Sequence, residues 1–276
     1  MSQSTLVAMD EVDEEEDAPE SDPPERQGKT PEIPPLRISR HVGEAERLLS
    51  QRFHAVRLSK SQRPDPVTLR GRPLIVYLNH PSWWDPLICV QLARELFPDR
   101  RHYGPIDAGT VGQYRSFTHM GFFAVESGSA RGARRFLNLA QDLLGRPDAA
   151  LWIPTQGSSG DPRERPVRLR SGIGSLASRV RQAVLLPLAL EVPFWDAQLP
   201  EALARFGEEL PAGDADLRAG DWTEVLEDRL QSALEALAAE SLARDPARFD
   251  VLLAGGAETH GLGQAWRRFL GSFKGG

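Results

Sequence analysis

The sequence predicts an α/β fold: a single domain in which helices flank a mixed, mostly parallel sheet. Short apolar runs such as 73–78 and 183–190 have the length and composition of strands buried on both faces. Longer segments between them carry apolar residues at three- and four-residue steps, which is typical of helices that cover a sheet. Because the two kinds of segment alternate along the chain, they indicate strands joined by helical crossovers.

The composition divides the 276 residues into three parts. Residues 1–35 are rich in Asp, Glu, Pro, Ser and Gln and nearly lack aromatic residues, so we expect a disordered acidic tail. Residues 36–212 show no break in composition and are long enough to bury one sizeable core, so we expect the main catalytic domain there. Residues 213–276 are expected to form a C-terminal helical extension.

Periodicity predicts the elements in order, beginning with an amphipathic helix over 38–58 that suits either a lipid surface or the face of a sheet. The expected strands cover 67–69, 73–78, 102–106, 122–125, 150–153, 183–190 and 206–210. The other expected helices cover 86–97, 110–120, 130–144, 173–181 and 222–244. Residues 262–274 combine Trp and Phe with Arg and Lys, which suits either membrane contact or docking against the domain.

The formal net charge of −6 is dominated by the N-terminal tail. Residues 1–36 hold eleven acidic residues against Arg26 and Lys29, whereas residues 37–276 hold 31 basic and 28 acidic residues. A slightly basic domain suits anionic lipid surfaces or phosphorylated substrates. Since no basic module with interleaved aromatic residues is present, we expect no nucleic-acid partner.

The cysteine, histidine and hydropathy patterns exclude other classes of protein. Cys89 is the only cysteine, which excludes a disulfide framework and a cysteine-based metal site. His102, His119 and His260 lack the spacing of metal ligands, so we expect no metal and no bound cofactor. No apolar run approaches the roughly 18 residues of a spanning helix, and no signal-peptide pattern follows Met1. A cytoplasmic protein without a transmembrane helix is therefore expected.

The strongest candidates for chemistry lie in segment 79–85, NHPSWWD, directly after an apolar run. His80 and Asp85 fall where a strand is expected to end and a helix to begin, which is where open α/β sheets place ligands. A turn would let the Asp85 carboxylate accept from one imidazole nitrogen and leave the other nitrogen to take a proton. Asp85 also precedes Pro86 and suits a helix N-cap, and the two roles are compatible.

Segment 79–85 resembles the NHX4D signature of the glycerolipid and lysophospholipid acyltransferase superfamily, which includes 1-acylglycerol-3-phosphate acyltransferases. Three further blocks follow in the order found in that family: 120–125 (MGFFAV), 151–158 (LWIPTQGS, in the place of FPEGTRS) and 186–190 (LPLAL). The resemblance covers about residues 69–210, which is most of the expected domain. It implies a glycerolipid acyltransferase-like α/β fold.

The resemblance implies that His80 is a general base, which takes the proton of an acceptor hydroxyl as it attacks an acyl thioester, while Asp85 stabilises the imidazolium. Substrate and oxyanion contacts are expected from four residues of the first and third blocks: Asn79, Gln156, Gly157 and Ser158. An apolar wall for an acyl chain or a lipid acceptor is expected from three aromatic residues: Trp83, Trp84 and Phe122.

Two departures from the family pattern concern phosphate recognition. The third block has Gln-Gly-Ser-Ser where the family has Glu-Gly-Thr-Arg, and Glu126 and Ser127 stand where an arginine follows the second block. Because Ser and Gln do not replace an arginine that binds phosphate, we expect the acceptor to be recognised differently. Arginines that follow the two blocks are candidates for holding a CoA phosphate, a carrier-protein helix or anionic lipid heads, with a solvated surface as the alternative: Arg131, Arg134 and Arg168.

The sequence therefore favours an O-acyltransferase that moves a fatty acyl group to a hydroxyl of a lipid acceptor. Acyl-CoA or acyl-carrier protein is the expected co-substrate, and the enzyme is expected to associate peripherally with a membrane. One alternative is a lysophosphatidate acyltransferase of phospholipid synthesis whose arginines are displaced along the chain. The other is a non-catalytic protein that binds lipids or acyl chains.

Overall fold

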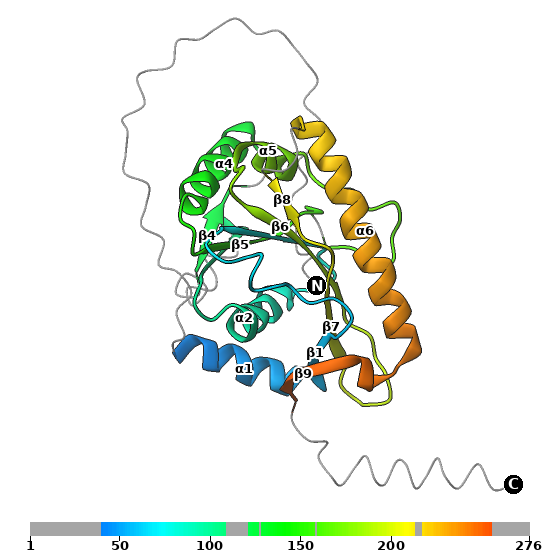
Figure 1. The fold of residues 1–276 in the computed structure, drawn as a ribbon. Helices are drawn as coiled ribbons and strands as arrows, with labels where there is room; N and C mark the ends of the chain where they lie inside the picture. The colour runs from blue at the N-terminus through cyan, green and yellow to red at the C-terminus, as the bar shows by residue number, and fades with distance from the viewer. Residues whose placement is uncertain (1–39, 109–120, 127, 158, 213–216, 256–276) are drawn as a thin grey trace, which may run out of the picture.

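A nine-stranded mixed sheet forms the centre of the described part of the chain, and helices cover both of its faces (Figure 1). This computed structural model describes residues 40–108, 121–126, 128–157, 159–212 and 217–255. The strands are β1 (Ala55–Ser59), β2 (Leu74–Leu78), β3 (Arg101–Asp107), β4 (Phe122–Val125), β5 (Ala149–Pro154), β6 (Val184–Glu191), β7 (Glu201–Phe206), β8 (Leu210–Pro211) and β9 (Phe249–Ala254). The helices are α1 (Arg40–Arg52), α2 (Asp85–Leu96), α4 (Ala130–Leu144), α5 (Gly172–Arg179) and α6 (Ala219–Ala243), with a short 3-10 helix, η3 (Pro246–Arg248). The predicted fold class, a single α/β domain with a mixed sheet, is confirmed.

The strand order places β2 inside the sheet, next to β5 and β6. The order is β4-β3-β5-β2-β6-β7-β1-β9, and β8 pairs with β6. Strands β4, β3, β5, β2 and β6 are parallel, whereas β7 runs antiparallel to β6 and β9 antiparallel to β1. The carboxyl ends of β2, β5 and β6 therefore meet at one edge of the sheet. We call this the site edge, formed by the residues that follow Leu78, Pro154 and Glu191.

Both faces of the sheet are buried, as strand β2 shows. Leu74, Val76 and Leu78 pack with residues of α1 and α2, whereas Ile75 and Tyr77 pack with residues of α4, α5 and α6. All five side chains are at most 2% exposed. Since successive strand residues point to opposite faces, a continuous apolar run is what a sheet covered on both sides requires.

Local residues fix the ends of the two helices that begin near the site edge. Helix α2 begins at Asp85 with Pro86 in its first turn, and it stops before Phe97, which precedes a proline. Ser129 caps α4, because its hydroxyl accepts a hydrogen bond from the Gly132 N–H at 3.0 Å. Each helix thus starts just beyond the carboxyl end of a parallel strand.

The first predicted helix, 38–58, is too long at its C-terminal end. Helix α1 ends at Arg52, and the following residues form strand β1 between β7 and β9. Arg57, which in the sequence indicates a polar helix face, is only 7% exposed and donates to the buried Glu201 carboxylate at 2.9 Å. Because a buried charge is tolerated when it is paired, this contact lets an arginine occupy a strand, and tertiary structure overrides the helical periodicity.

The strand predictions change in three further places. Residues 67–69 form a turn, because the Asp65 carboxylate accepts hydrogen bonds from the Val67 N–H and the Thr68 hydroxyl, both at 2.9 Å. The strand predicted at 206–210 lies earlier, as β7, and only β8 falls near it. The sequence pattern does not predict β9. The helix predicted at 110–120 and the aromatic segment 262–274 lie outside the described residues.

Residues beyond the predicted boundary at 212 contribute to the same sheet and core. Helix α6 packs along α5 and β6, and its Trp222 is fully buried. Strand β9 pairs with β1 at the edge of the sheet, where Phe249 is buried. Within the described residues, no helix has both the length and the apolar character needed to cross a membrane.

Gly174 and Gly172, both in α5, offer a matched test of the packing between α5 and α6. A Cβ on Gly174 would collide with the Ala219 carbonyl and the Thr223 hydroxyl, whereas a Cβ on Gly172 meets nothing. We expect Gly174→Ala to lower the free energy of unfolding by about 1–3 kcal/mol through overpacking. Gly172→Ala should leave it unchanged or raise it by up to about 1 kcal/mol, because alanine favours the helix. Urea denaturation measures both, and equal losses would contradict this packing.

Candidate active site

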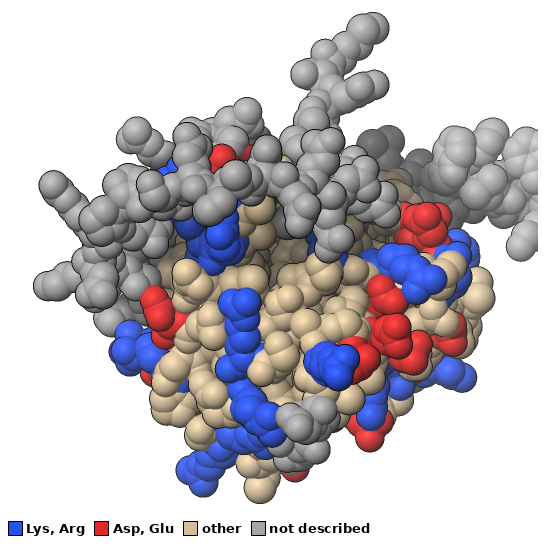
Figure 2. Space-filling model, turned by 90° about the horizontal axis from the view of Figure 1, so that it is seen from above, with Lys and Arg blue, Asp and Glu red and all other residues tan. Residues whose placement is uncertain are grey.

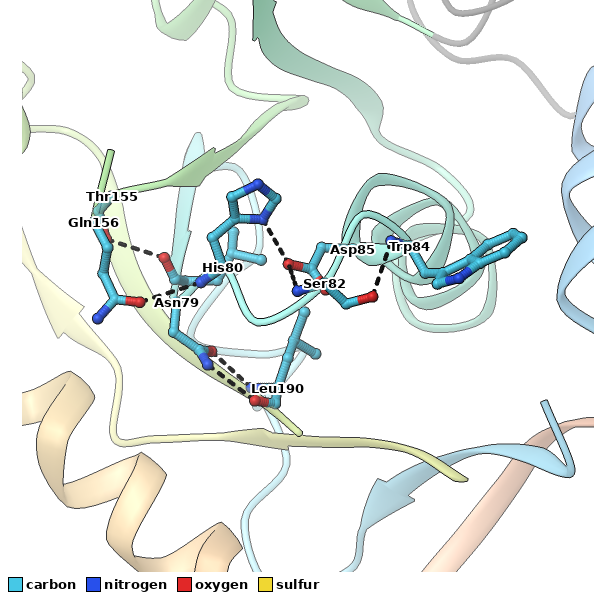
Figure 3. A network of polar contacts seen from close by, with 9 residues as sticks. Asn79, His80, Ser82, Trp84, Asp85, Thr155, Gln156 and Leu190 are labelled. Carbon is cyan, nitrogen blue, oxygen red and sulfur yellow. Dashed lines mark hydrogen bonds and ion pairs between the residues drawn. The ribbon is translucent and has the colours of Figure 1, made fainter. Parts of the chain in front are cut away.

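The site edge brings together residues that follow three adjacent parallel strands. His80 lies just after β2, Gln156 lies just after β5, and Leu190 lies near the end of β6 (Figure 3). Asp85 is the first residue of α2, so the loop between strand and helix carries both members of the predicted pair. One tight loop therefore brings His80 and Asp85, which are near each other in the sequence, close together in space.

The structure brings His80 and Asp85 into direct contact. The His80 Nδ1 and an Asp85 carboxylate oxygen lie 2.7 Å apart, and the same oxygen accepts from the Ser82 N–H at 3.2 Å. Beside a carboxylate, Nδ1 carries the proton and donates it, which leaves Nε2 as an acceptor. In Figure 3 the Nε2 side of the ring points away from Asp85. The His80 side chain is 14% exposed and that of Asp85 only 3%, so the imidazole is partly accessible and the carboxylate is not.

The Asp85 carboxyl is held in an unusual electrostatic environment. Burial raises its pKa, and the hydrogen bond from His80 and the His80 charge oppose that rise. The second oxygen, Oδ1, is buried and accepts no hydrogen bond from the described residues. A poorly solvated carboxylate interacts strongly with a neighbouring positive charge, so Asp85 is suited to stabilise a protonated His80.

Asn79, predicted to contact substrate, is bound to the backbone of strand β6 in the structure. Its Nδ2 donates to the Leu190 carbonyl at 2.9 Å, and its Oδ1 accepts from the Leu190 N–H at 2.8 Å. Asn79 is fully buried. Because both ends of the amide are occupied by the backbone of β6, the side chain ties the start of the His80 loop to the neighbouring strand.

The residues of the third block hold the backbone of His80 from the other side. The Gln156 Oε1 accepts from the His80 N–H at 3.2 Å, and the Gly160 N–H donates to the His80 carbonyl at 3.1 Å. Gln156 therefore contacts His80 through the main chain. Ser158, the last residue predicted for this region, lies outside the described residues.

Arg170 lies at the site. In the sequence it is one of several arginines that follow the third block, and no sequence signal distinguishes it from the others. Gly157 has a φ of +81°, a conformation that favours glycine, and a Cβ there would collide with the Arg170 guanidinium. The Arg170 N–H donates to the Thr155 carbonyl at 3.0 Å, which fixes the start of its side chain beside β5. The third block, which lacks its own arginine, thus acquires a guanidinium from further along the chain.

The two tryptophans of the motif differ in their surroundings. Trp84 packs edge-on against Phe53 of the segment after α1, with ring centroids 5.8 Å apart, and against Trp83 at 5.2 Å. Trp83 is 53% exposed. Trp84 therefore belongs to an aromatic cluster between α1 and α2, and Trp83 lies at the surface beside the base.

Phe122 lines a small apolar cavity between α2 and the sheet. The cavity has a volume of about 20 Å³, room for little more than one water-sized group, and its lining includes Cys89, Gly104 and Trp152. His102 also lines it, but burial lowers the pKa of this histidine to about 4, and its Nδ1 accepts from the Trp152 indole at 3.1 Å. An acyl chain requires more space than this cavity provides, and of the three aromatic residues predicted to form the wall only Phe122 lines it.

The three arginines predicted to bind an anion do not gather at His80. Arg131 and Arg134 are exposed on α4. Figure 2 shows basic side chains gathered over one part of the surface and basic and acidic side chains mixed over another. Arg168 donates to the Glu227 carboxylate of α6 at 3.0 Å, with its side chain 74% exposed. Arg168 is therefore engaged away from the site. In the described part of the chain, no group of three or more His, Cys, Asp or Glu side chains is arranged to hold a metal ion.

Asp85→Asn tests whether the buried carboxylate lowers the free energy of unfolding. Since burial raises its folded-state pKa above the ordinary value of 3.8, its contribution to stability is present in acid and is lost as the pH rises through the raised pKa. Asparagine does not titrate but still accepts from His80. We expect Asp85→Asn to be at least as stable as the wild type at neutral pH, with its relative stability falling in acid. Urea denaturation at several pH values measures this, with the exposed Asp99→Asn as control. Loss of stability at neutral pH would contradict it.

Comparison with known proteins gives a structural likeness and no match by sequence. No family model matches the chain, and no curated protein matches it. Among solved structures, the chain is similar to the 1-acyl-sn-glycerophosphate (LPA) acyltransferase PlsC from Thermotoga maritima. The TM-score is 0.47 and the sequence identity 14%, over 72% of this chain and 80% of that chain. A likeness at this level does not bear on the reaction, which has to be inferred from the residues themselves.

Proposed function

We propose that the protein is an O-acyltransferase that moves a fatty acyl group from a thioester, acyl-CoA or acyl-carrier protein, to a hydroxyl of a lipid acceptor. The observation that carries the proposal is the 2.7 Å contact between His80 Nδ1 and Asp85, which leaves Nε2 accessible at the carboxyl edge of a parallel sheet. The order of the four sequence blocks supports it, because a base held by a carboxylate fits many reactions, whereas these blocks together resemble one superfamily.

In the proposed reaction His80 acts first as a base and then as an acid. Its Nε2 takes the proton of the acceptor hydroxyl while the oxygen forms a bond to the thioester carbonyl carbon. The tetrahedral intermediate then breaks its carbon–sulfur bond, and the imidazolium returns the proton to the leaving thiolate. Asp85 keeps the proton on Nδ1 throughout and stabilises the imidazolium. Backbone N–H groups around Gly157 are the proposed donors to the oxyanion, since a glycine permits close approach.

Direct transfer to the acceptor fits the nucleophiles near the pair. Burial raises the pKa of the Cys89 thiol well above its usual range, so the reactive thiolate is disfavoured. The Ser82 hydroxyl accepts a hydrogen bond from the Trp84 N–H at 3.1 Å, within the loop itself. A mechanism without a covalent acyl-enzyme therefore requires only the histidine, the carboxylate and the two substrates.

A phosphorylated acceptor such as lysophosphatidate is a second candidate, and Arg170 favours it. Its guanidinium lies against Gly157, in the block where the superfamily carries its phosphate-binding arginine. Arginine binds phosphate through a planar fork of donors, so a guanidinium displaced along the chain supplies the same chemistry if it reaches the same place. The choice between a phosphorylated and a neutral lipid acceptor thus depends on this residue.

His80→Ala and Asp85→Asn should each lower kcat by about 10²- to 10⁴-fold, because the first removes the base and the second its ionised partner. Thiol release from palmitoyl-CoA, with a lipid extract as acceptor, measures the rate. His54→Ala is the matched control, since His54 contacts the Glu201 carboxylate at 2.6 Å near the same edge and should retain activity. Undiminished turnover of His80→Ala would refute the assignment of the base. Binding of palmitoyl-CoA by the wild type without turnover on any extract would support a non-catalytic binding protein instead.

Arg170→Gln separates the two kinds of acceptor. If Arg170 binds a phosphate, the KM for lysophosphatidate should rise by about 10-fold or more, because a charge-assisted hydrogen bond is lost. The KM for a neutral glycolipid acceptor should not change. Arg168→Gln is the control, since Arg168 is paired with Glu227 on α6. Equal changes for both acceptors would show that Arg170 supports the loop rather than the phosphate.

A further inference from the structure

Three arginines form one exposed cluster on the outer face of α4, outside the site described above. Arg134 and Arg135 lie three and four residues after Arg131, which places both beside Arg131 on the helix surface. All three are exposed. In the described part of the chain none of them forms an ion pair, and neither does Glu126, the acidic residue just before the helix. We call Arg131, Arg134 and Arg135 the α4 cluster.

The position of the α4 cluster is unfavourable for the folded chain alone. It occupies the first turns of α4, where the helix dipole is positive and repels cations, and the first turn carries no acidic residue. Like charges at these spacings also repel each other. Two other arginines at the surface are paired, Arg168 with Glu227 and Arg163 with Glu191 at 2.7 Å. A cluster that the fold leaves uncompensated is suited to an anionic partner.

The helix cannot turn the α4 cluster away from solvent, because its opposite face is fixed. Leu137, Ala140 and Leu144 belong to the core under α4. Phe136 stacks on Phe123 of β4, with ring centroids 6.3 Å apart. The arginines therefore stand on the exposed face of a packed helix, and three exposed charges in a row fit the surface of a macromolecule better than a small anion.

We infer that the α4 cluster is the docking surface for an acidic helix of an acyl-carrier protein that delivers the thioester; this rests on the proposed function. The start of α4 follows the carboxyl end of β4, and β4 is three strands from β2 in the sheet. The lateral separation is therefore about 14 Å, taking about 4.8 Å for each strand. The extended pantetheine arm of a carrier protein spans such a distance, so the carrier can sit on α4 while its thioester reaches His80.

A protein partner fits the surface around the α4 cluster better than a membrane does. The large hydrophobic side chains that are exposed in the described residues lie on other elements: Val67, Trp83, Phe194, Leu242 and Val251. Interfacial membrane binding relies on apolar and aromatic side chains beside the basic ones. Without them, complementary charge is the available source of binding, which is the mode expected for an acidic helix.

The test compares Arg131→Glu/Arg134→Glu with Arg47→Glu/Arg70→Glu, a control that reverses two other exposed arginines for which the described residues provide no ion pair. We expect the α4 variant to raise the KM for palmitoyl-acyl-carrier protein by about 10-fold or more, with kcat and the KM for palmitoyl-CoA within about twofold of the wild type. Its melting temperature should equal or exceed that of the wild type, since acidic residues suit the start of a helix. The control should change none of these values.

Fluorescence anisotropy of a labelled acyl-carrier protein measures docking separately from turnover. If the wild type releases thiol from neither thioester, the proposed reaction fails, and anisotropy alone decides the docking surface. Unchanged carrier binding by the α4 variant overturns the inference. So does an equal rise in the KM for palmitoyl-CoA, which would make the cluster a site for CoA phosphates. Loss of sedimentation with phosphatidylglycerol vesicles, with carrier binding intact, would overturn it in favour of a membrane.

Discussion

The paired hydrogen bonds between the Asn79 amide and the backbone of Leu190 are the constraint on which the site depends. Backbone pairing between β2 and β6 extends to Leu78 and Leu188, and the Asn79 side chain continues the connection beyond that point. Gln156 holds the His80 backbone from the opposite side. The imidazole therefore stands on a loop tied to both neighbouring strands, and a base fixed in this way needs little reorganisation to react.

Burial of the Asp85 carboxylate lowers the stability of the fold and strengthens the interaction of this carboxylate with a protonated His80. Burial raises the pKa of this group, so the ionised form is disfavoured in the fold, yet only the ionised form stabilises a protonated His80. Solvation of the carboxylate would relieve the first effect and weaken the second, since water screens the attraction between the two charges. In this site the Asp85 side chain is 3% exposed and the His80 side chain is 14% exposed, so the carboxylate is poorly solvated while the imidazole is partly exposed.

The sequence predicts those parts of the structure that depend on nearby residues. The buried strands β2 and β6 and the helices α2, α4 and α6 follow from apolar runs and periodicity, and the contact of His80 with Asp85 follows from a short covalent spacing. Strand β1 could not be predicted, because Arg57 is accommodated through Glu201 and Trp195, which are distant in sequence. The contact of Arg170 with Gly157 and the role of Asn79 likewise depend on how β5 and β6 flank β2, an arrangement that no local pattern encodes.

The groups proposed for catalysis and those proposed for recognition are supported by different kinds of structure. The loop that carries the groups proposed to move the proton is held by hydrogen bonds to β6 and to residues that follow β5, so substitutions elsewhere on the surface leave it in place. The arginines proposed for recognition come from loops and helix surfaces, and their partners differ: Glu227 binds Arg168, Gly157 lies under Arg170, and the α4 cluster is uncompensated. Since surface charges change without disturbing a buried core, a fold built in this way can keep one reaction while its donor and acceptor vary.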